Sequence, residues 1–409
     1  MKNTGFNRRW SIALMALLIV GYAAFITWTY QQGFQRSARG ERPLFTDFTS
    51  TYGAGLLLRE VPAEYLYHQK FMTRATEEAG NAAYHGSLSE TQKKKVGFAP
   101  WMYPPTFIAL VLPLGFLSYF GALISWLAVT AIPYLMAMRA ILDKDRAAIW
   151  IAMAAPPFFY NAMFGQTGFL SAGLIGLGLF YILPRPWLAG LLIGLASVKP
   201  HLGLLIPFAL LAGGHWRVFV SAFATVISMI LSSILAFGLE PWFAFIGTTL
   251  FHMEGFQHGA YTWNIMTSAL SVAHLSGANL DTAWRLQAMV SVVSVAMVSL
   301  VWWRGRHRPD SFHLQAAVLC SSIPLATPMI YLYDLVVLVV ALAWLMQDMK
   351  CRGFKPWEVA SIALSMIGLL LAKPLGGVPG MHVGMISIVA LLCLSLFRFR
   401  LLMAEVRPG

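Results

Sequence analysis

The sequence predicts an all-α polytopic membrane protein with about 12 transmembrane helices. The chain of 409 residues is 58% hydrophobic and only 11% charged, and apolar blocks recur from residue 11 to residue 397. Both features are typical of proteins that cross a bilayer many times. The net charge of +12 comes mostly from Lys and Arg in short turns between apolar blocks, where such residues determine topology. We expect one integral membrane domain over residues 1–409.

The first apolar stretch, residues 11–30, is predicted to be a retained membrane span. It follows Lys2, Arg8 and Arg9, as a secretory signal sequence does. The stretch is too long for a cleaved signal, however, and it ends in aromatic residues without a small-residue cleavage site. Its basic flank places the N-terminus in the cytoplasm and residues 31–103 outside.

The block at 105–138 is too long for one span and is interrupted by Pro113 and Gly115. Either it crosses the membrane twice, or a half-helix at 105–118 dips in and a single span follows. One crossing would put the later basic turns in the cytoplasm, as the orientation rule prefers. These turns contain Arg139, Lys144, Arg146, Arg185, Arg217 and the basic runs at 304–308, 350–355 and 398–400. The exception is Lys93–Lys95, in a long outer loop of the kind that is largely exempt from the rule.

The remaining apolar segments are separated by short inner turns and one further long outer loop. They run at about 147–163, 168–183, 187–198, 201–213, 217–238, 283–303, 312–327, 329–346, 357–373 and 380–397. The two larger outer elements are therefore residues 31–103 and about 239–282. This pattern concentrates the polar side chains of the protein on its outer face.

Several function classes are disfavoured by composition. No basic face interleaved with aromatic residues suggests nucleic-acid binding. Cys320, Cys351 and Cys393 have no metal or redox spacing, so a disulfide framework is not expected. No internal repeat of transporter length is evident.

Asp47 is the first candidate functional residue, in the stretch "FTDFTSTYGAGLLL" at 45–58. An acid close to the end of the hydrocarbon layer is a functional candidate by default. The structural alternative is that Asp47 caps a helix that begins near Phe48, because Asp is a favoured N-cap and the sequence soon turns apolar.

Lys199 is the second candidate, in "GLASVKPHLGLL" at 194–205. It separates two apolar pieces of about 12 residues, and a helix of that length covers only about 18 Å of a core about 30 Å thick. The tip of this hairpin should therefore lie in a protein-lined recess, where a lysine needs an anionic partner. Lys199 could instead extend to the lipid headgroups, or its ammonium could bind a phosphate.

The other candidates share the predicted outer face. Each alone is more often a cap, a turn or a solvated loop residue, but together they could converge on one outward-facing cavity. The segment "WMYPPTF" at 101–107 should re-enter the membrane stiffly, because proline fixes φ and tolerates only a first-turn position in a helix. The substrate-binding candidates are Tyr103, Gln166, His201, His252, Glu254, His258 and Asp334.

The order of these segments resembles the GT87 or DUF2029 family of GT-C glycosyltransferases, which includes polyprenyl-phosphate-mannose-dependent mannosyltransferases. The resemblance runs from about residue 44 to 346 and rests on "DFTSTYGAGLLL" with "EYLY", "YPPTF", "FGQTGFL", "RPWLAGLLIGLASVKPHLGLLIP" and "TPMIYLYDL". It implies a GT-C-like fold. It also implies that Asp47 is the catalytic base and that Lys199 lies near the donor phosphate. Better-known members carry a histidine-rich stretch where this chain has "YLYDL".

The function implied is transfer of a hexose, with mannose expected, from a polyprenyl-phosphate donor to a hydroxyl of a glycolipid or glycan acceptor. A single displacement would invert the anomeric centre. No cofactor is expected, no nucleotide-binding signature is present, and possible metal ligands are too sparse to propose a metal. We expect the protein in the inner (plasma) membrane, and the charge pattern places its site on the periplasmic or outer face. The rival class is a multi-pass transporter or lipid flippase, which predicts mid-span charges and an internal repeat.

Overall fold

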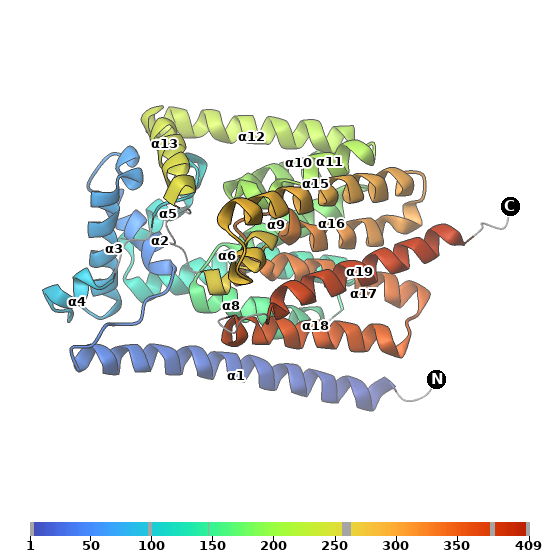
Figure 1. Ribbon diagram of the computed structural model, residues 1–409, viewed down its shortest axis with the longest axis horizontal. Coiled ribbons are helices and arrows are strands. Elements are labelled where there is room, and N and C mark those ends of the chain that lie inside the picture. The colour runs from blue at the N-terminus through green and yellow to red at the C-terminus, as the bar shows by residue number, and fades with distance from the viewer. Residues whose placement is uncertain (1–3, 97–99, 146, 256–262, 377–380, 406–409) are drawn as a thin grey trace. The chain divides into compact units, whose positions relative to one another are not determined.

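The structure, a computed structural model, describes residues 4–96, 100–145, 147–255, 263–376 and 381–405. Within these ranges every regular element is helical, apart from an isolated β-bridge between Met266 and Tyr331 (Figure 1). The first half contains α1 (Thr4–Ala38), α2 (Phe48–Leu57), η1 (Ala63–Tyr67), α3 (Gln69–Ala83), α4 (Glu90–Lys94), η2 (Pro105–Phe107), α5 (Ile108–Val111), η3 (Leu112–Phe116), α6 (Tyr119–Ile141), α7 (Ala147–Ala154), α8 (Pro156–Phe164), α9 (Gly168–Tyr181), α10 (Pro186–Leu195), η4 (Ala196–Val198), η5 (Pro200–Gly203) and α11 (Ile206–Ala212). The second half contains α12 (Trp216–Phe237), α13 (Glu240–Gly255), η7 (Trp263–Ile265), α14 (Ala269–Leu275), α15 (Leu280–Gly305), η8 (Pro309–Ser311), α16 (Phe312–Ala326), η9 (Leu332–Leu335), α17 (Val336–Arg352), α18 (Pro356–Leu375) and α19 (Val383–Ala404).

Helix length limits how many of these elements can cross a membrane. In the described ranges, seven helices are long and apolar enough to span, or eight if the bent pair α7 and α8 forms one span. The expected count of about twelve is not confirmed. Three of the predicted spans, at about 168–183, 187–198 and 201–213, are instead among the four apolar helices of 10–17 residues. Even 17 residues cover only about 26 Å of a hydrocarbon core about 30 Å thick.

The block at 105–138 is divided into a short helical run and one long helix, as expected if it crosses the membrane once. Pro105 opens η2, with Pro104 at its N-cap, so both prolines occupy the helix start, where they are tolerated. The helical run ends at Phe116 and is one of the four short apolar helices. Only α6, which follows it, is long enough to cross.

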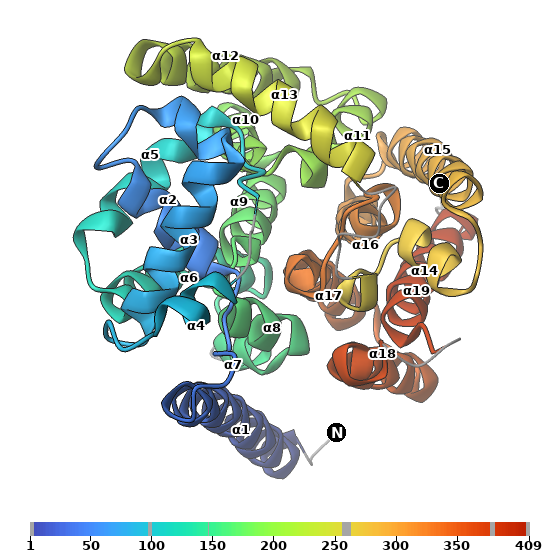
Figure 2. The same ribbon diagram turned by 60° about the vertical axis from the view of Figure 1, so that its left-hand side comes forward.

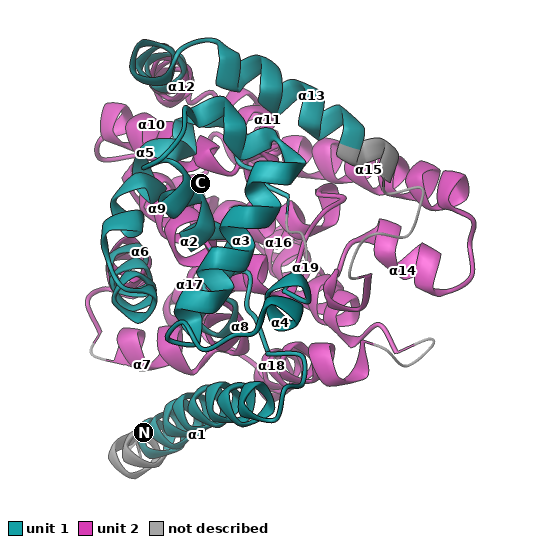
Figure 3. Ribbon diagram, turned by 90° about the vertical axis from the view of Figure 1, so that its left-hand side faces the viewer, with its two compact units in different colours: residues 1–130, 162–166, 227–260 teal, residues 131–161, 167–226, 261–409 magenta. Residues whose placement is uncertain are grey.

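The described chain folds into two compact units, coloured separately in Figure 3. Unit 1 comprises residues 1–130, 162–166 and 227–260, and unit 2 comprises residues 131–161, 167–226 and 261–409. Helices α6, α8 and α12 each contribute to both units. The assignment of residues 1–409 to one functional domain stays a prediction.

Unit 1 is built around the short helix α2, which packs against α3 and η3. Glycines make this packing possible. A Cβ at Gly115 would lie 2.1 Å from the backbone oxygen of Gly55, and a Cβ at Gly53 would lie 2.8 Å from the backbone oxygen of Ala75. Gly53 and Gly55 therefore let the backbones of α3 and η3 pack closely against α2.

Unit 2 is centred on α17, which is buried along nearly its whole length. It packs against α9, α16 and α19, and Figure 2 shows these helices around it. A helix that is apolar on all sides belongs in the interior of such a bundle. The N-terminal end of α17 carries η9 and with it Asp334, so this candidate residue is anchored to the most buried helix of the unit.

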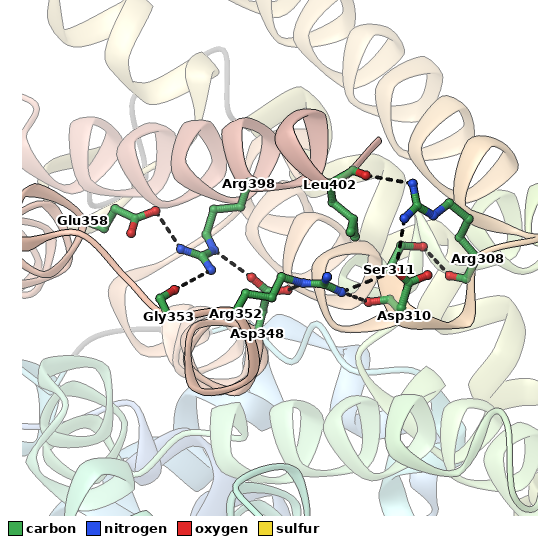
Figure 4. A network of polar contacts seen from close by, with 9 residues as sticks. All are labelled: Arg308, Asp310, Ser311, Asp348, Arg352, Gly353, Glu358, Arg398 and Leu402. Carbon is green, nitrogen blue, oxygen red and sulfur yellow. Dashed lines mark hydrogen bonds and ion pairs between the residues drawn. The ribbon is translucent and has the colours of Figure 1, made fainter. Parts of the chain in front are cut away.

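Three of the predicted inner-face basic turns meet in one charge network of unit 2 (Figure 4). Arg398 donates to Asp348 at 2.7 Å and to Glu358 at 2.8 Å, and both acids are buried. Arg352 also donates to Asp348, at 2.8 Å, and Arg308 donates to the backbone oxygen of Leu402 at 2.8 Å. The basic runs at 304–308, 350–355 and 398–400 therefore lie at the same end of unit 2.

Candidate functional site

Asp47 sits at the N-cap position of α2, as expected, but its side chain makes no capping hydrogen bond. Its carboxylate oxygen Oδ2 instead accepts a hydrogen bond of 3.0 Å from Nε2 of Gln166. The two residues are 119 positions apart in the chain, and both belong to unit 1. Asp47 is half-buried, so a side-chain amide orients its carboxylate while part of the residue remains accessible.

Gln166 reaches Asp47 because the chain turns sharply after α8. Gly165 has φ +67°, a left-handed conformation that favours glycine. A Cβ at this position would lie 2.5 Å from Cβ of Phe48, the residue next to Asp47. The indole N–H of Trp126 donates to the backbone oxygen of Gly165 at 3.1 Å. The turn is thus fixed in conformation and pressed against the start of α2.

Tyr103 completes this first cluster. Its hydroxyl donates to Oε1 of Gln166 at 2.7 Å, which orients the amide so that Nε2 faces Asp47. The Tyr103 ring stacks on Phe107 with centroids 4.3 Å apart, and its backbone oxygen accepts from the Tyr67 hydroxyl at 2.9 Å. Burial raises the pKa of Tyr67, so its hydroxyl stays a neutral donor. A relay of hydrogen bonds therefore runs from Tyr103 through Gln166 to Asp47.

The second cluster lies in unit 2 and contains Lys199 and Asp334. Lys199 is the residue between η4 and η5, and the flanking helices Pro186–Val198 and Pro200–Ala212 are among the short apolar ones. Its side chain is buried, and Nζ donates to Oδ1 of Asp334, which is 1% exposed. The structure thus confirms the protein-lined position of Lys199 and shows an acidic partner for it.

The surroundings of this ion pair hold both partners in place. The backbone N–H of Tyr331 donates to the second oxygen of Asp334 at 3.2 Å, and the ring of Tyr333 lies 5.1 Å from Nζ of Lys199. His201 follows two residues after Lys199, and Nε2 of its ring is buried without a hydrogen-bond partner in the described part of the chain. Since buried polar atoms are nearly always satisfied, this nitrogen can take a ligand that carries an acceptor or a donor.

The structure distributes the predicted site residues over these two clusters. Asp47, Tyr103 and Gln166 meet in unit 1, and Lys199, His201 and Asp334 belong to unit 2. His252 and Glu254 are part of α13, which packs against η1 in unit 1. The side chains of His252 and Glu254 lie outside the described residues, and so does His258 altogether.

Sequence reasoning did not identify Tyr67 or Tyr333 as part of these clusters. Both lie in quoted motifs, "EYLY" and "YLYDL", but a tyrosine in an aromatic-rich chain carries no spacing signal that separates it from packing residues. Only the hydrogen bond of Tyr67 and the ring contact of Tyr333 with Lys199 reveal them. No group of three or more His, Cys, Asp or Glu side chains that could hold a metal occurs among the residues that the structure describes.

Fold and site together define a multi-pass, all-helical membrane protein in which an oriented carboxylate and a buried lysine lie near apolar helices. The chain belongs to glycosyltransferase family 87, whose family model matches residues 101–328, more than half of the sequence. No curated protein and no solved structure matches it significantly. The matched stretch contains Tyr103, Gln166, Lys199 and His201, whereas Asp47 precedes it and Asp334 follows it.

Family membership decides between the two function classes that the sequence left open. A member of family 87 is a glycosyltransferase, so this chain is a membrane glycosyltransferase rather than a transporter or a lipid flippase. Such an enzyme requires a sugar donor, an acceptor and the bilayer. The resemblance of the motifs to this family is thereby confirmed.

Proposed function

We propose that the protein transfers a hexose, with mannose as the expected sugar, from a polyprenyl-phosphate donor to a hydroxyl of a glycolipid or glycan. The anomeric centre is inverted in one displacement. The observation that carries this proposal is the state of Asp47: its carboxylate is not used as a helix cap and is oriented by Gln166. A carboxylate that is held in this way and remains partly exposed is suited to accept a proton.

The proposed role of Asp47 is that of general base. As the acceptor oxygen attacks the anomeric carbon, its proton passes to Asp47, and the bond between that carbon and the phosphate oxygen breaks. The electron pair of the broken bond stays on the phosphate, so the leaving group is polyprenyl phosphate. The hydrogen-bond relay from Tyr103 through Gln166 supports this step because it fixes the direction of the carboxylate.

The proposed role of Lys199 is to stabilise the charge that grows on the leaving phosphate. Before the donor binds, Asp334 keeps the buried ammonium paired, since an unpaired buried charge is costly. A phosphate that approaches Lys199 would therefore compete with Asp334 for the ammonium. The unpartnered Nε2 of His201 is the second group that we assign to this ligand. The remaining candidates, His252, Glu254 and His258, are proposed to contact the sugars.

The test of this function is transfer of sugar by the purified protein from a synthetic polyprenyl-phosphate-hexose. Asp47→Asn keeps the size of the side chain and abolishes its basicity, so turnover should fall roughly 10²- to 10⁴-fold, the usual contribution of a positioned base. The matched control is Asp281→Asn, the same change in an exposed ion pair with Arg285, which should leave turnover intact. Near wild-type transfer by a folded Asp47→Asn variant would remove Asp47 from the mechanism.

The face of the membrane is also a proposal: the site lies on the outer or periplasmic face of the inner membrane. It rests on the basic turns at 304–308 and 350–355, which the orientation rule places inside. Cys351 is exposed and lies in one of these turns. Once the other two cysteines are replaced by serine, labelling of Cys351 shows on which side of the membrane the turn lies. It should react with an impermeant maleimide only after permeabilisation, whereas Thr91→Cys in a cysteine-free background should react in intact cells. The opposite pattern would place the site in the cytoplasm.

A further inference from the structure

Two basic runs that are far apart in the sequence lie together in unit 1. Nε of Arg42 donates to the backbone oxygen of Lys95 at 3.1 Å. The side-chain amide of Gln92, in α4, donates to the backbone oxygens of Ser37 and Glu41 at 2.9 and 3.0 Å. These bonds dock α4 against the end of α1. They create what we call the basic patch, which consists of Arg36, Arg39, Arg42, Lys93, Lys94 and Lys95.

The basic patch carries more positive charge than its own acids neutralise. Glu41 lies 3.3 Å from Arg36 and 3.5 Å from Arg39, and Glu90 pairs with Lys93 at 2.8 Å. With six basic residues and these two acids, the patch keeps an excess of four positive charges. Lys94 and Lys95 are exposed, and neither has an ion-pair partner among the described residues.

The position of the patch along α1 matches the depth of lipid headgroups. The candidate span Ser11–Ala38 has 28 residues and is therefore about 42 Å long, which equals a bilayer with its headgroup layers rather than the hydrocarbon core alone. Trp28 and Tyr30 mark the boundary, since aromatic residues prefer that level. Arg36 lies about 9 Å beyond Tyr30 along the axis of α1, at 1.5 Å per residue. At this level its side chain can reach lipid phosphates.

Lys93, Lys94 and Lys95 lie in a long outer loop that is largely exempt from the orientation rule, so topology does not account for them. A lysine run in a translocated loop contributes nothing to topology. It does strengthen attraction to an anionic surface when it lies within a Debye length of that surface, and the contacts with the end of α1 provide this proximity.

We propose that the basic patch binds the phosphate-bearing headgroups of anionic phospholipids in the leaflet where α1 ends. The site is separate from the Asp47 and Lys199 clusters and does not depend on the sugar chemistry. It holds the α3 and α4 part of unit 1 against the membrane surface, because α4 is bonded to the patch and α3 packs on α4.

The test is photolabelling of the full-length protein in phosphatidylcholine vesicles that contain a trace of phosphatidylglycerol with a photoreactive group near its headgroup. A phosphatidylcholine analogue with the same group serves as the neutral probe. Digestion after aromatic or acidic residues keeps the peptides identical when basic residues are changed. The phosphatidylglycerol probe should label residues 36–42 and 90–95 more strongly than the neutral probe. High salt should reduce this preference, because it screens exposed charges.

The variant Arg39→Gln/Lys94→Gln/Lys95→Gln should lower the preference in these peptides by roughly two- to tenfold. The matched control removes three exposed arginines elsewhere, Arg217, Arg304 and Arg306, and should leave labelling of the basic patch unchanged. If the triple variant does not purify as a folded protein, the single variants Lys94→Gln and Lys95→Gln and the salt series carry the test. Equal labelling by both probes, a preference insensitive to salt, or unchanged labelling of a folded triple variant would overturn the proposal.

Discussion

The buried pair of Lys199 and Asp334 allows a prediction that separates folding from donor binding. Asp334→Asn keeps the shape of the side chain but leaves the ammonium of Lys199, which is only 6% exposed, without its carboxylate. Removing one partner of a buried ion pair costs about 3–5 kcal/mol of unfolding free energy. We expect a loss in this range, at the upper end because Asp334 is itself only 1% exposed. The measurement is the unfolding free energy in a denaturant series in detergent micelles.

The double variant Lys199→Met/Asp334→Leu should be much more stable than Asp334→Asn, because replacement of a buried pair by apolar residues of similar volume is often neutral or stabilising. If Lys199 also binds the donor phosphate, this double variant should fold and still fail to use the lipid-linked donor. Additive losses in the double variant would show that the two side chains are not coupled. Wild-type donor kinetics in the folded double variant would remove Lys199 from phosphate binding while leaving the stability argument intact.

Two further predictions concern packing and charge elsewhere. Arg398→Lys should retain only part of the stability that Arg398 confers, because lysine lacks the planar fork with which arginine donates to Asp348 and Glu358 at the same time. Arg398→Met should cost about 3–5 kcal/mol of unfolding free energy. Equal stability of the wild type and both variants would refute this reasoning. Gly115→Ala should cost about 1–3 kcal/mol by overpacking α2, measured by the same denaturant series, whereas Gly21→Ala, where a Cβ meets nothing within 4 Å, should be neutral or stabilising.

The class of protein could be predicted from the sequence because it depends on local properties. Apolar blocks between basic turns require a bilayer whatever their packing, and the interruption at Pro113 and Gly115 predicts the end of a helix from local chemistry. The short pieces on either side of Lys199 likewise predict a recessed, protein-lined lysine, and the structure shows a buried one. The count of about twelve spans is not confirmed, because several of the apolar segments that composition identifies form helices shorter than a membrane span.

The sequence identified the segments that contain the functional motifs, but it did not indicate which residues of these segments contact one another. Nothing local predicts that Gln166 bonds to Asp47 across 119 positions, or that Lys199 pairs with Asp334 across 135. Spacing alone favoured the capping interpretation of Asp47. The structure places Asp47 at the N-cap position without a side-chain cap bond and shows instead a bond from Gln166.

The sequence by itself thus determined the membrane class, the helical fold, the family and the identity of the candidate groups. Tertiary structure alone decided which of these groups meet, because a hydrogen bond between distant residues depends on where two backbones are brought by packing. Gly55 and Gly115 show the reason in one contact: their missing side chains let η3 approach α2. The sharp turn at Gly165 then brings Gln166 to the start of that helix. Contacts between residues so far apart in the sequence arise from the packed fold and cannot be predicted from any single stretch of the chain.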